Sequence, residues 1–179
     1  HTNHDAIAAL NTLFAQDGLV VYVPAGVTLE QPVQLINLFR STEPIMANRR
    51  ILFVVEDGAS AKLLVCDHSM GDTDFLSTEV IEIFAGRDAV VDYYDLEESS
   101  IRTRRFSSLF VEQEAGSNVL VNGITLNNGQ TRNNYRARIN GEHAELTLCG
   151  MAIEDREQRV DTYSHIAHRV PNCTSNELF

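Results

Sequence analysis

The stretch Gly116-Ser117-Asn118-Val119-Leu120-Val121 contains a pattern that occurs four times in this 179-residue chain. The pattern is a glycine, two variable residues, an alanine or valine, one more variable residue and an apolar residue. Its other copies begin at Gly58, Gly86 and Gly141, so successive glycines are 28, 30 and 25 residues apart. Each of the last three glycines is preceded by a second strand-like run. These runs are residues 80–84, 108–111 and 135–139.

This near-constant spacing predicts an all-β, two-sheet solenoid, in which each turn of chain buries its inner face against the turns above and below. Glycine is favoured at the corners of such a coil because the backbone turns sharply there without a Cβ clash. The alternative is a β-sandwich, whose strands recur about every 8–12 residues without self-similarity over a longer period. Two polar segments, Met70-Gly71-Asp72 and Asn127-Asn128-Gly129, are expected to be protruding turns.

A short amphipathic helix is expected before the solenoid, over residues 4–16. Four apolar residues recur there at three- and four-residue spacing: Ile7, Leu10, Leu13 and Phe14. Asn3 precedes them as the expected N-cap, and Gly18 follows as the stop signal. We therefore divide the chain into an N-terminal helix, residues 1–18, and a β-helix core, residues 19–179.

Charge and hydrophobicity limit the function classes. The chain has 14 Lys and Arg against 25 Asp and Glu, a net charge of −11, which disfavours nucleic acid as a partner. The longest apolar stretches, such as residues 51–55, are far shorter than the roughly 20 residues that span a bilayer. The single lysine, Lys62, follows no glycine-rich loop, so the sequence does not support ATP or NAD binding.

The first residue and the cysteines suggest the context of the protein. The chain begins at His1 rather than at methionine and has no signal-peptide pattern, so we expect it to be a piece of a longer protein. Cys66, Cys149 and Cys173 are an odd number at wide spacing, which is typical of neither a disulfide framework nor a zinc motif. The sequence therefore favours a cytoplasmic location.

Two groups of residues could carry metal or nucleophilic chemistry. Cys66-Asp67-His68-Ser69 gathers four reactive types, but Asp67 would point away from Cys66 and His68 on a strand, so we favour a strand end running into a polar turn. A second group holds the densest set of potential zinc or iron ligands: Asp161, His165, His168 and Cys173. Because His165 and His168 would lie on opposite faces of a strand, we favour surface histidines and a small buried cysteine there.

An acidic stretch invites a different hypothesis, a carbohydrate-active enzyme on a β-helix. The stretch runs from Asp88 to Glu98 and includes Asp92, Asp95 and Glu97. Paired carboxylates can act as acid and base in glycoside hydrolysis. We favour a solvated acidic face instead, paired with the basic residues that follow it: Arg102, Arg104 and Arg105.

Three ordered runs resemble the SufD family of iron-sulfur cluster assembly proteins. They are Val121-Asn122-Gly123-Ile124-Thr125-Leu126-Asn127-Asn128-Gly129, then Arg136-Ala137-Arg138-Ile139-Asn140-Gly141-Glu142-His143-Ala144-Glu145, and then Asp161-Thr162-Tyr163-Ser164-His165-Ile166-Ala167-His168-Arg169-Val170-Pro171-Asn172-Cys173-Thr174-Ser175. The upstream Tyr22-Val23-Pro24-Ala25-Gly26-Val27 is similar to the start of the family's core. The resemblance covers nearly the whole chain.

The resemblance implies a right-handed parallel β-helix in a cytoplasmic complex with the scaffold SufB and the ATPase SufC. In the family SufC hydrolyses ATP, SufB carries the nascent cluster, and SufD supports iron supply and complex formation. This chain would then be a non-ATPase subunit and no enzyme by itself. No cofactor is expected in the chain, the iron-sulfur cluster belonging to the whole complex, and neither nucleic acid nor membrane is expected as a partner.

One departure from the family limits the site assignment. The family's Lys-Cys-Ser-His-Gly motif has no match in this chain, so we carry over no catalytic, cofactor or metal residue. The residues that we assign to a partner interface are Asp161, His165, His168 and Cys173. The last coil, around residues 160–170, is expected to expose an unpaired strand edge that could pair with SufB or with a second copy in a homodimer.

Overall fold

A computed structural model describes residues 5–179, which form one helix and two parallel sheets of six strands each. The helix is α1 (Ala6–Phe14). The first sheet contains, in spatial order, β1 (Leu19–Val23), β3 (Ile45–Val55), β5 (Phe75–Ala85), β7 (Thr103–Gln113), β9 (Gln130–Ile139) and β11 (Arg159–His168). The second contains β2 (Val33–Arg40), β4 (Ser60–Met70), β6 (Val90–Glu98), β8 (Asn118–Asn127), β10 (Glu145–Ala152) and β12 (Thr174–Leu178).

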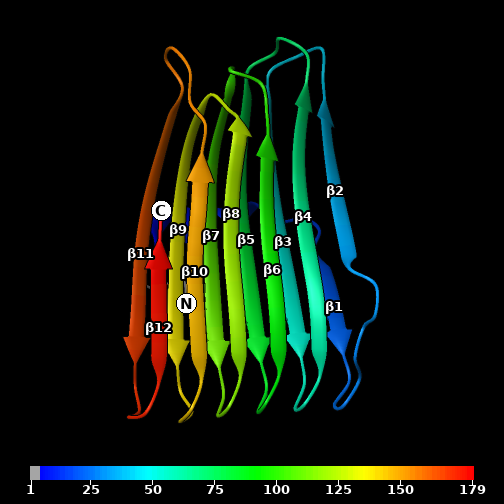
Figure 1. Ribbon diagram of the computed structural model, residues 1–179. Helices are drawn as coiled ribbons and strands as arrows, with labels where there is room; N and C mark the ends of the chain where they lie inside the picture. Colours follow the sequence, from blue (N-terminus) through cyan, green and yellow to red (C-terminus); the bar gives the residue numbers. More distant parts are fainter. Residues whose placement is uncertain (1–4) are drawn as a thin grey trace.

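The chain alternates between the two sheets and so winds into a solenoid. Even-numbered strands run up the front of Figure 1 and odd-numbered strands run down behind them, while the coil advances from β2 to β12 with a right-handed path. Residues one coil apart are hydrogen-bonded neighbours at separations of 26 residues, as for Arg104 and Gln130, to 32 residues, as for Leu19 and Ile51. The predicted parallel β-helix is confirmed, and the sandwich alternative is wrong.

The glycines of the repeat lie at the short turns that join each odd strand to the next even strand, at the lower edge of Figure 1. Gly116 has φ +69°, a left-handed conformation that favours glycine. At Gly141, a Cβ atom would lie 1.9 Å from the backbone nitrogen of Ala115 in the coil before. The turns stack too closely for a side chain at Gly86 and Gly141, whereas Gly58 and Gly116 occupy the left-handed position that Asp88 and His143 take in the other two turns.

The space between the sheets has two parts that differ in chemistry. Near the short turns the inward side chains are apolar, and we call this part the apolar compartment. It includes Phe53, Val65, Ile83, Leu109, Val121 and Leu146. Toward the opposite edge the same strands point polar and charged side chains inward, and we call this part the polar compartment. It includes Asp67, Glu79, Asp95, Glu97 and Arg105, together with Arg49, whose side chain is 14% exposed.

Helix α1 lies on the outer face of the first sheet, where Ala8 packs against Val80 and Phe110. Its N-cap is Asp5, whose carboxylate accepts from the backbone N–H groups of Ile7 and Ala8. The predicted N-cap, Asn3, lies outside the described residues. The helix is confirmed, but with narrower bounds than 4–16.

The apolar face expected for this helix is wrong for its second half, while Ile7 and Leu10 in its first half are half-buried. Leu13 and Phe14 are exposed, whereas Asn11 is buried. The amide of Asn11 donates to the backbone oxygens of Arg49 and Thr78, so the helix is fixed to the sheet by polar contacts that hydrophobic spacing does not reveal.

The expected protruding turns are turns, but they do not both protrude. Gly71 follows β4 in an exposed loop with φ +101°. Asn128 is fully buried instead, and its side-chain amide donates to Thr131 and to the backbone oxygen of Arg159 in the next coil. The division at residue 18 stays a prediction. Over residues 5–179 the structure contains no helix long and apolar enough to cross a membrane.

Candidate functional site

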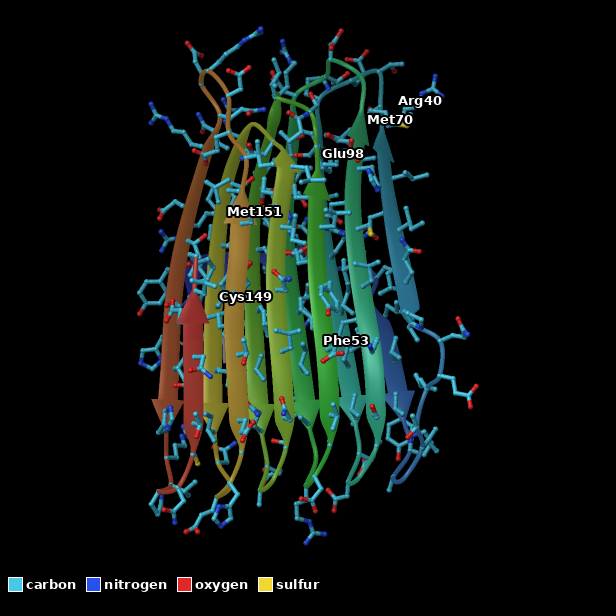
Figure 2. The ribbon with its side chains drawn as sticks, in the orientation of Figure 1. Arg40, Phe53, Met70, Glu98, Cys149 and Met151 are labelled. Carbon is cyan, nitrogen blue, oxygen red and sulfur yellow. The ribbon has the colours of Figure 1, made fainter. Side chains whose placement is uncertain are left out.

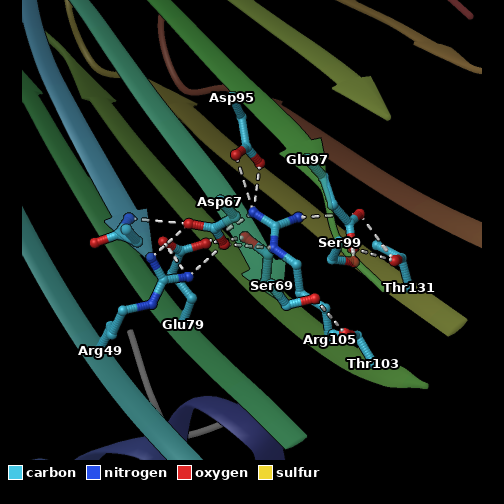
Figure 3. A network of polar contacts seen from close by, with 12 residues as sticks. Arg49, Asp67, Ser69, Glu79, Asp95, Glu97, Ser99, Thr103, Arg105 and Thr131 are labelled. Atoms are coloured by element: carbon cyan, nitrogen blue, oxygen red, sulfur yellow. Dashed lines mark hydrogen bonds and ion pairs between the residues drawn. The ribbon is translucent and has the colours of Figure 1, made fainter. Parts of the chain in front are cut away.

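The centre of the polar compartment is Arg105, which extends from β7 into the interior with 2% of its side chain exposed. Its Nη2 donates to Glu79 Oε2 at 2.8 Å and to both carboxylate oxygens of Asp95, at 2.8 and 2.9 Å. Its Nε donates to Asp67 at 3.2 Å, and Glu97 lies 3.8 Å from Nη1. One guanidinium therefore connects four carboxylates from three other strands (Figure 3).

Arg49 on β3 is the second cation of the network. Its two terminal nitrogens donate to the two carboxylate oxygens of Asp67, a bidentate geometry that only arginine offers. Its Nη2 also lies 3.1 Å from Glu79 Oε1, and Asn37 donates to Asp67 from the neighbouring strand β2. Asp67 and Glu79 are thus each held between two guanidinium groups.

Hydroxyl groups complete the network near the long-turn edge. Glu97 accepts from Thr131 at 2.9 Å, from Ser99 at 2.9 Å and from Thr125 at 3.4 Å. Beside it, the hydroxyls of Ser69 and Thr103 lie 3.0 Å apart and link the two sheets (Figure 3). Buried charges are tolerated when they are paired and hydrogen-bonded. Every charged group of the network has an ionic partner, although Glu79 Oε1 and Arg49 Nε make no hydrogen bond within residues 5–179.

The strand period explains why these charges point inward. Side chains alternate between the two faces of a strand, so a residue two positions from an inward residue also points inward. Asp67 follows Val65 in this phase, Asp95 follows Tyr93, and Glu79 precedes Ile81. Each charged residue therefore continues the inward row of its own strand.

The network contains four carboxylates and two guanidiniums. Burial raises the pKa values of the carboxylates, and the charges of the two arginines lower them. Burial raises the pKa of Glu79 to about 7, although Arg49 and Arg105 oppose the shift. Burial also raises the pKa of Asp95 and of Glu97 above their ordinary values, again against the charge of Arg105. For Asp67, burial acts in the same upward direction, but Arg49 and Arg105 together outweigh it and hold the pKa below its ordinary value. With its pKa at about 7, Glu79 carries a proton in a substantial fraction of molecules at neutral pH.

The carbohydrate-active reading of the acidic stretch is not supported by this geometry. Asp95 and Glu97 are 4% and 1% exposed and are bound by Arg105, so no glycan reaches them. The expectation of a solvated face is wrong for these two residues and correct for Glu98, which is exposed and lies 3.4 Å from His68. Of the three arginines expected to pair with the acids, Arg105 does so in the interior, whereas Arg102 pairs with Asp74 on the surface.

The Cys66–Ser69 group is split between the two faces of β4, as the strand period predicts. Cys66 and His68 face outward, while Asp67 is part of the buried network. The interpretation as a strand end running into a polar turn is wrong for Asp67, because that side chain is sealed inside the coil. The sequence analysis missed Arg49 and Glu79 entirely, although both lie in phase with buried apolar residues of their strands.

The four residues assigned to a partner interface lie on the last coil, but the structure does not gather them. Asp161 pairs with Arg132 on the outer face, and His165 lies on the same face of β11. His168 lies on the opposite face, 2.9 Å from the Ser175 hydroxyl, and Cys173 lies in the turn before β12. Within the described part of the chain no group of three His, Cys, Asp or Glu side chains could hold a metal ion. Their interface role stays a prediction.

The last coil does present the strand edge that was expected around residues 160–170. β11 pairs with β9 on one side, and no strand of residues 5–179 pairs with it on the other. β12 pairs likewise only with β10 in the described chain, so both sheets end at this coil.

Comparison with known proteins gives the family. A model described as the SUF system FeS cluster assembly SufBD core domain matches residues 38–179, and one described as the SufBD protein N-terminal region matches residues 1–35. The boundary between the two matched regions lies within β2.

Curated relatives agree with these matches. An iron-sulfur cluster assembly SufBD family protein of Synechocystis is 24% identical over 98% of this chain and 41% of its own length. A SufBD family protein of Staphylococcus epidermidis is 28% identical over 94% of the chain and 36% of its length. Protein ABCI7, chloroplastic, of Arabidopsis thaliana is 25% identical over 97% of the chain and 38% of its length.

The chain thus spans about two fifths of the length of these relatives. Both family models and the two bacterial names refer to the SufBD family as a whole, which is coarser than the resemblance to SufD alone. With the core-domain model covering most of the solenoid, the chain belongs to the SufBD family of iron-sulfur cluster assembly proteins.

Proposed function

We propose that this chain acts as part of a SufD-type, non-ATPase subunit of a cytoplasmic complex with a SufB-like scaffold and a SufC-like ATPase. In that complex it supports assembly and the supply of iron to the scaffold, while the iron-sulfur cluster is cargo of the complex and no cofactor of this chain. The chain itself performs no catalytic step.

The observation that carries the proposal is the match of the SufBD core domain to residues 38–179, which places nearly the entire solenoid in this family. The structure adds physical support. Its interior is filled by an apolar core and an ionic network, and its functional contribution therefore lies on its surfaces and strand edges. Such a stacked coil is a rigid element on which other subunits can assemble.

The test is anaerobic co-purification of SufB and SufC with the full-length protein that contains this chain. We expect both partners to be retained, and Asp161→Arg to reduce SufB retention because it reverses the charge on the outer face of the last coil. Glu30→Arg is the matched control, since Glu30 is also an exposed acid and lies at the opposite end of the solenoid. Failure of the wild-type protein to retain either partner would contradict the proposed function. Equal losses of SufB retention in both variants would show that the last coil is not part of the SufB interface.

A further inference from the structure

The outer faces of the two sheets differ, and the difference points to a docking surface. On the first sheet the outer face is covered by α1 and by ion pairs between neighbouring strands, such as Arg50 with Glu82. On the second sheet, which faces the viewer in Figure 2, apolar side chains such as Met70 and Met151 lie beside charged ones such as Arg40 and Glu98 near the long-turn edge. No helix of residues 5–179 covers them.

The apolar side chains on this face lie in register from strand to strand. One row runs from Ile36 through Cys66, Leu96 and Ile124 to Met151, each paired with the next across the sheet. Ile36, Leu38 and Met70 are 56%, 66% and 59% exposed. The row crosses five strands and is exposed at its two ends, at Ile36 and Met151, while Leu96 and Ile124 are half-buried and Cys66 is covered.

Two hollows meet at Asn127, which lines both: one lies on this face, and the other lies at the long-turn edge, where Arg104 and Gln130 of the first sheet also line it. The first, of about 480 Å³, is lined by Ile36, Leu38 and Met70. The second, of about 750 Å³, lies under the β10–β11 loop and is lined by Ile101, Leu126 and Ile153. Together they form what we call the outer groove.

The charges around the outer groove are predominantly acidic. Glu98 lines the first hollow beside His68, and Glu154, Asp155 and Glu157 line the second, against two arginines, Arg104 and Arg156, of which Arg156 pairs with Asp155. The whole chain carries a net charge of −11, which adds to the negative potential. An apolar groove with an acidic rim is complementary to an apolar stripe bordered by basic residues.

We propose that the outer groove binds an amphipathic helix of a partner protein, with its apolar stripe in the groove and Lys or Arg on both flanks. A helix fits because the outer face of a sheet in this fold already accepts one, α1, on the opposite side. Neither a second copy nor an anionic membrane fits, since each would bring negative charge against the acidic rim. This inference does not depend on the identity of the partner in the proposed function.

The probe is a fluorescein-labelled synthetic peptide of about 18 residues, long enough for five helical turns, with Leu on one face and Lys elsewhere. A matched peptide carries Glu in place of each Lys. Fluorescence anisotropy with the purified protein is expected to show binding of the Lys peptide and none of the Glu peptide at the same concentrations. The double variant Leu38→Ser, Met70→Ser is expected to weaken binding at least about tenfold, because it removes two exposed apolar anchors.

Val90→Ser is the matched control. Val90 is an exposed apolar residue on the outer face of the same sheet, but it lies at the short-turn end of β6, away from the groove. Binding by this variant is expected to stay within about twofold of wild type. Melting curves by circular dichroism verify that both variants are folded.

Three results would overturn the proposal. The first is equal binding of the Lys and Glu peptides, and the second is an equal loss in Val90→Ser and in the double variant. The third is a dimer by light scattering that the double variant converts to a monomer, which would make a second copy the occupant of the groove.

Discussion

The apolar and polar compartments are built from the same strands, yet they depend on different physics. In β4, Leu63 and Val65 belong to the apolar compartment, and Asp67, two positions further on, belongs to the ionic network. The apolar compartment is stabilised by removing surface from water, which tolerates many side chains of similar volume. The polar compartment is stabilised only when each charge meets its partner. From this contrast we infer that the polar compartment determines how the coils stack, whereas the apolar compartment supplies most of the free energy of folding.

The largest effect is expected from Arg105→Ala. It removes the cation that contacts four carboxylates, and unpaired buried charges typically cost about 3–5 kcal/mol or more. The free energy of unfolding in urea should fall by at least this amount, or the protein should fail to fold.

Arg87→Ala is the matched control, because Arg87 pairs with Asp57 on the surface, where such pairs contribute about 0–1 kcal/mol. If Arg105→Ala lowered the free energy of unfolding by less than about 1 kcal/mol, its carboxylate partners would not be buried with it, and the account would be contradicted.

In the apolar compartment, Phe53→Ala should cost about 3–4 kcal/mol, because it leaves a cavity in a packed core beside Tyr93. The measurement is again unfolding in urea, with Tyr22→Ala, an exposed aromatic on β1, expected to change stability far less. A volume-conserving Phe53→Leu should recover much of the loss, whereas Arg105→Lys should not, because lysine lacks the planar fork of donors. If Arg105→Lys recovered much of the lost stability, the polar compartment would tolerate a conservative substitution as the apolar compartment does, and the contrast between them would be contradicted.

The pH dependence of stability separates two carboxylates of the network. The folded-state pKa of Glu79 is raised to about 7, above its ordinary value of 4.5, so the folded state binds the proton more tightly and stability falls as pH rises between these values. Glu79→Gln removes this dependence, so its stability relative to wild type should improve from pH 5 to pH 8.

Asp67→Asn is the contrasting variant. The pKa of Asp67 is lowered in the folded state, so its stabilising effect is complete above its ordinary value of 3.8. Its loss on substitution should therefore be constant from pH 5 to pH 8. Thermal melts at intervals of pH test both expectations, and parallel difference curves for the two variants would contradict the account.

The smallest effect is expected from removing one hydroxyl of the network. Thr131→Val keeps the shape of the side chain but deletes the donor to Glu97 and one of the two acceptors of the Asn128 amide, which should cost about 1–2 kcal/mol. Thr147→Val, on the outer face of β10, should change the free energy of unfolding by less than about 0.5 kcal/mol. Equal effects would mean that Glu97 has other donors that can replace this hydroxyl.

The sequence predicted the apolar compartment and the coil much better than the polar compartment. The glycine spacing depends on contacts within one turn of chain and its neighbour, and the structure places Gly116 and Gly141 at the stacked corners. The network depends on which coil carries each charge: Asp67, Asp95 and Arg105 lie on different strands and meet only after the register is set. When each charged residue is considered alone, the sequence predicts that it lies on the surface. That prediction is correct for most charged residues and wrong for these.

A second signal was present but unused. Arg49 and Glu79 lie in the inward phase of strands whose neighbouring inward residues, Ile51 and Ile81, are buried. A charged residue in phase with a buried apolar row predicts a buried ion, provided that an opposite charge occurs in phase on an adjacent coil. The helix shows the same limit, because the contact made by Asn11 depends on the sheet below it and not on the spacing of Leu13 and Phe14.

The central claim is that a carboxylate network lies sealed between the sheets, and the most direct test is the titration of Glu79 itself. Carbon-13 NMR of the glutamate side-chain carboxyl groups follows each one with pH, and Glu79→Gln assigns the resonance by its disappearance. The account predicts a midpoint at about 7 for that resonance. A midpoint at the ordinary value of 4.5 would show that burial does not outweigh Arg49 and Arg105 at Glu79, and would contradict this account of the network.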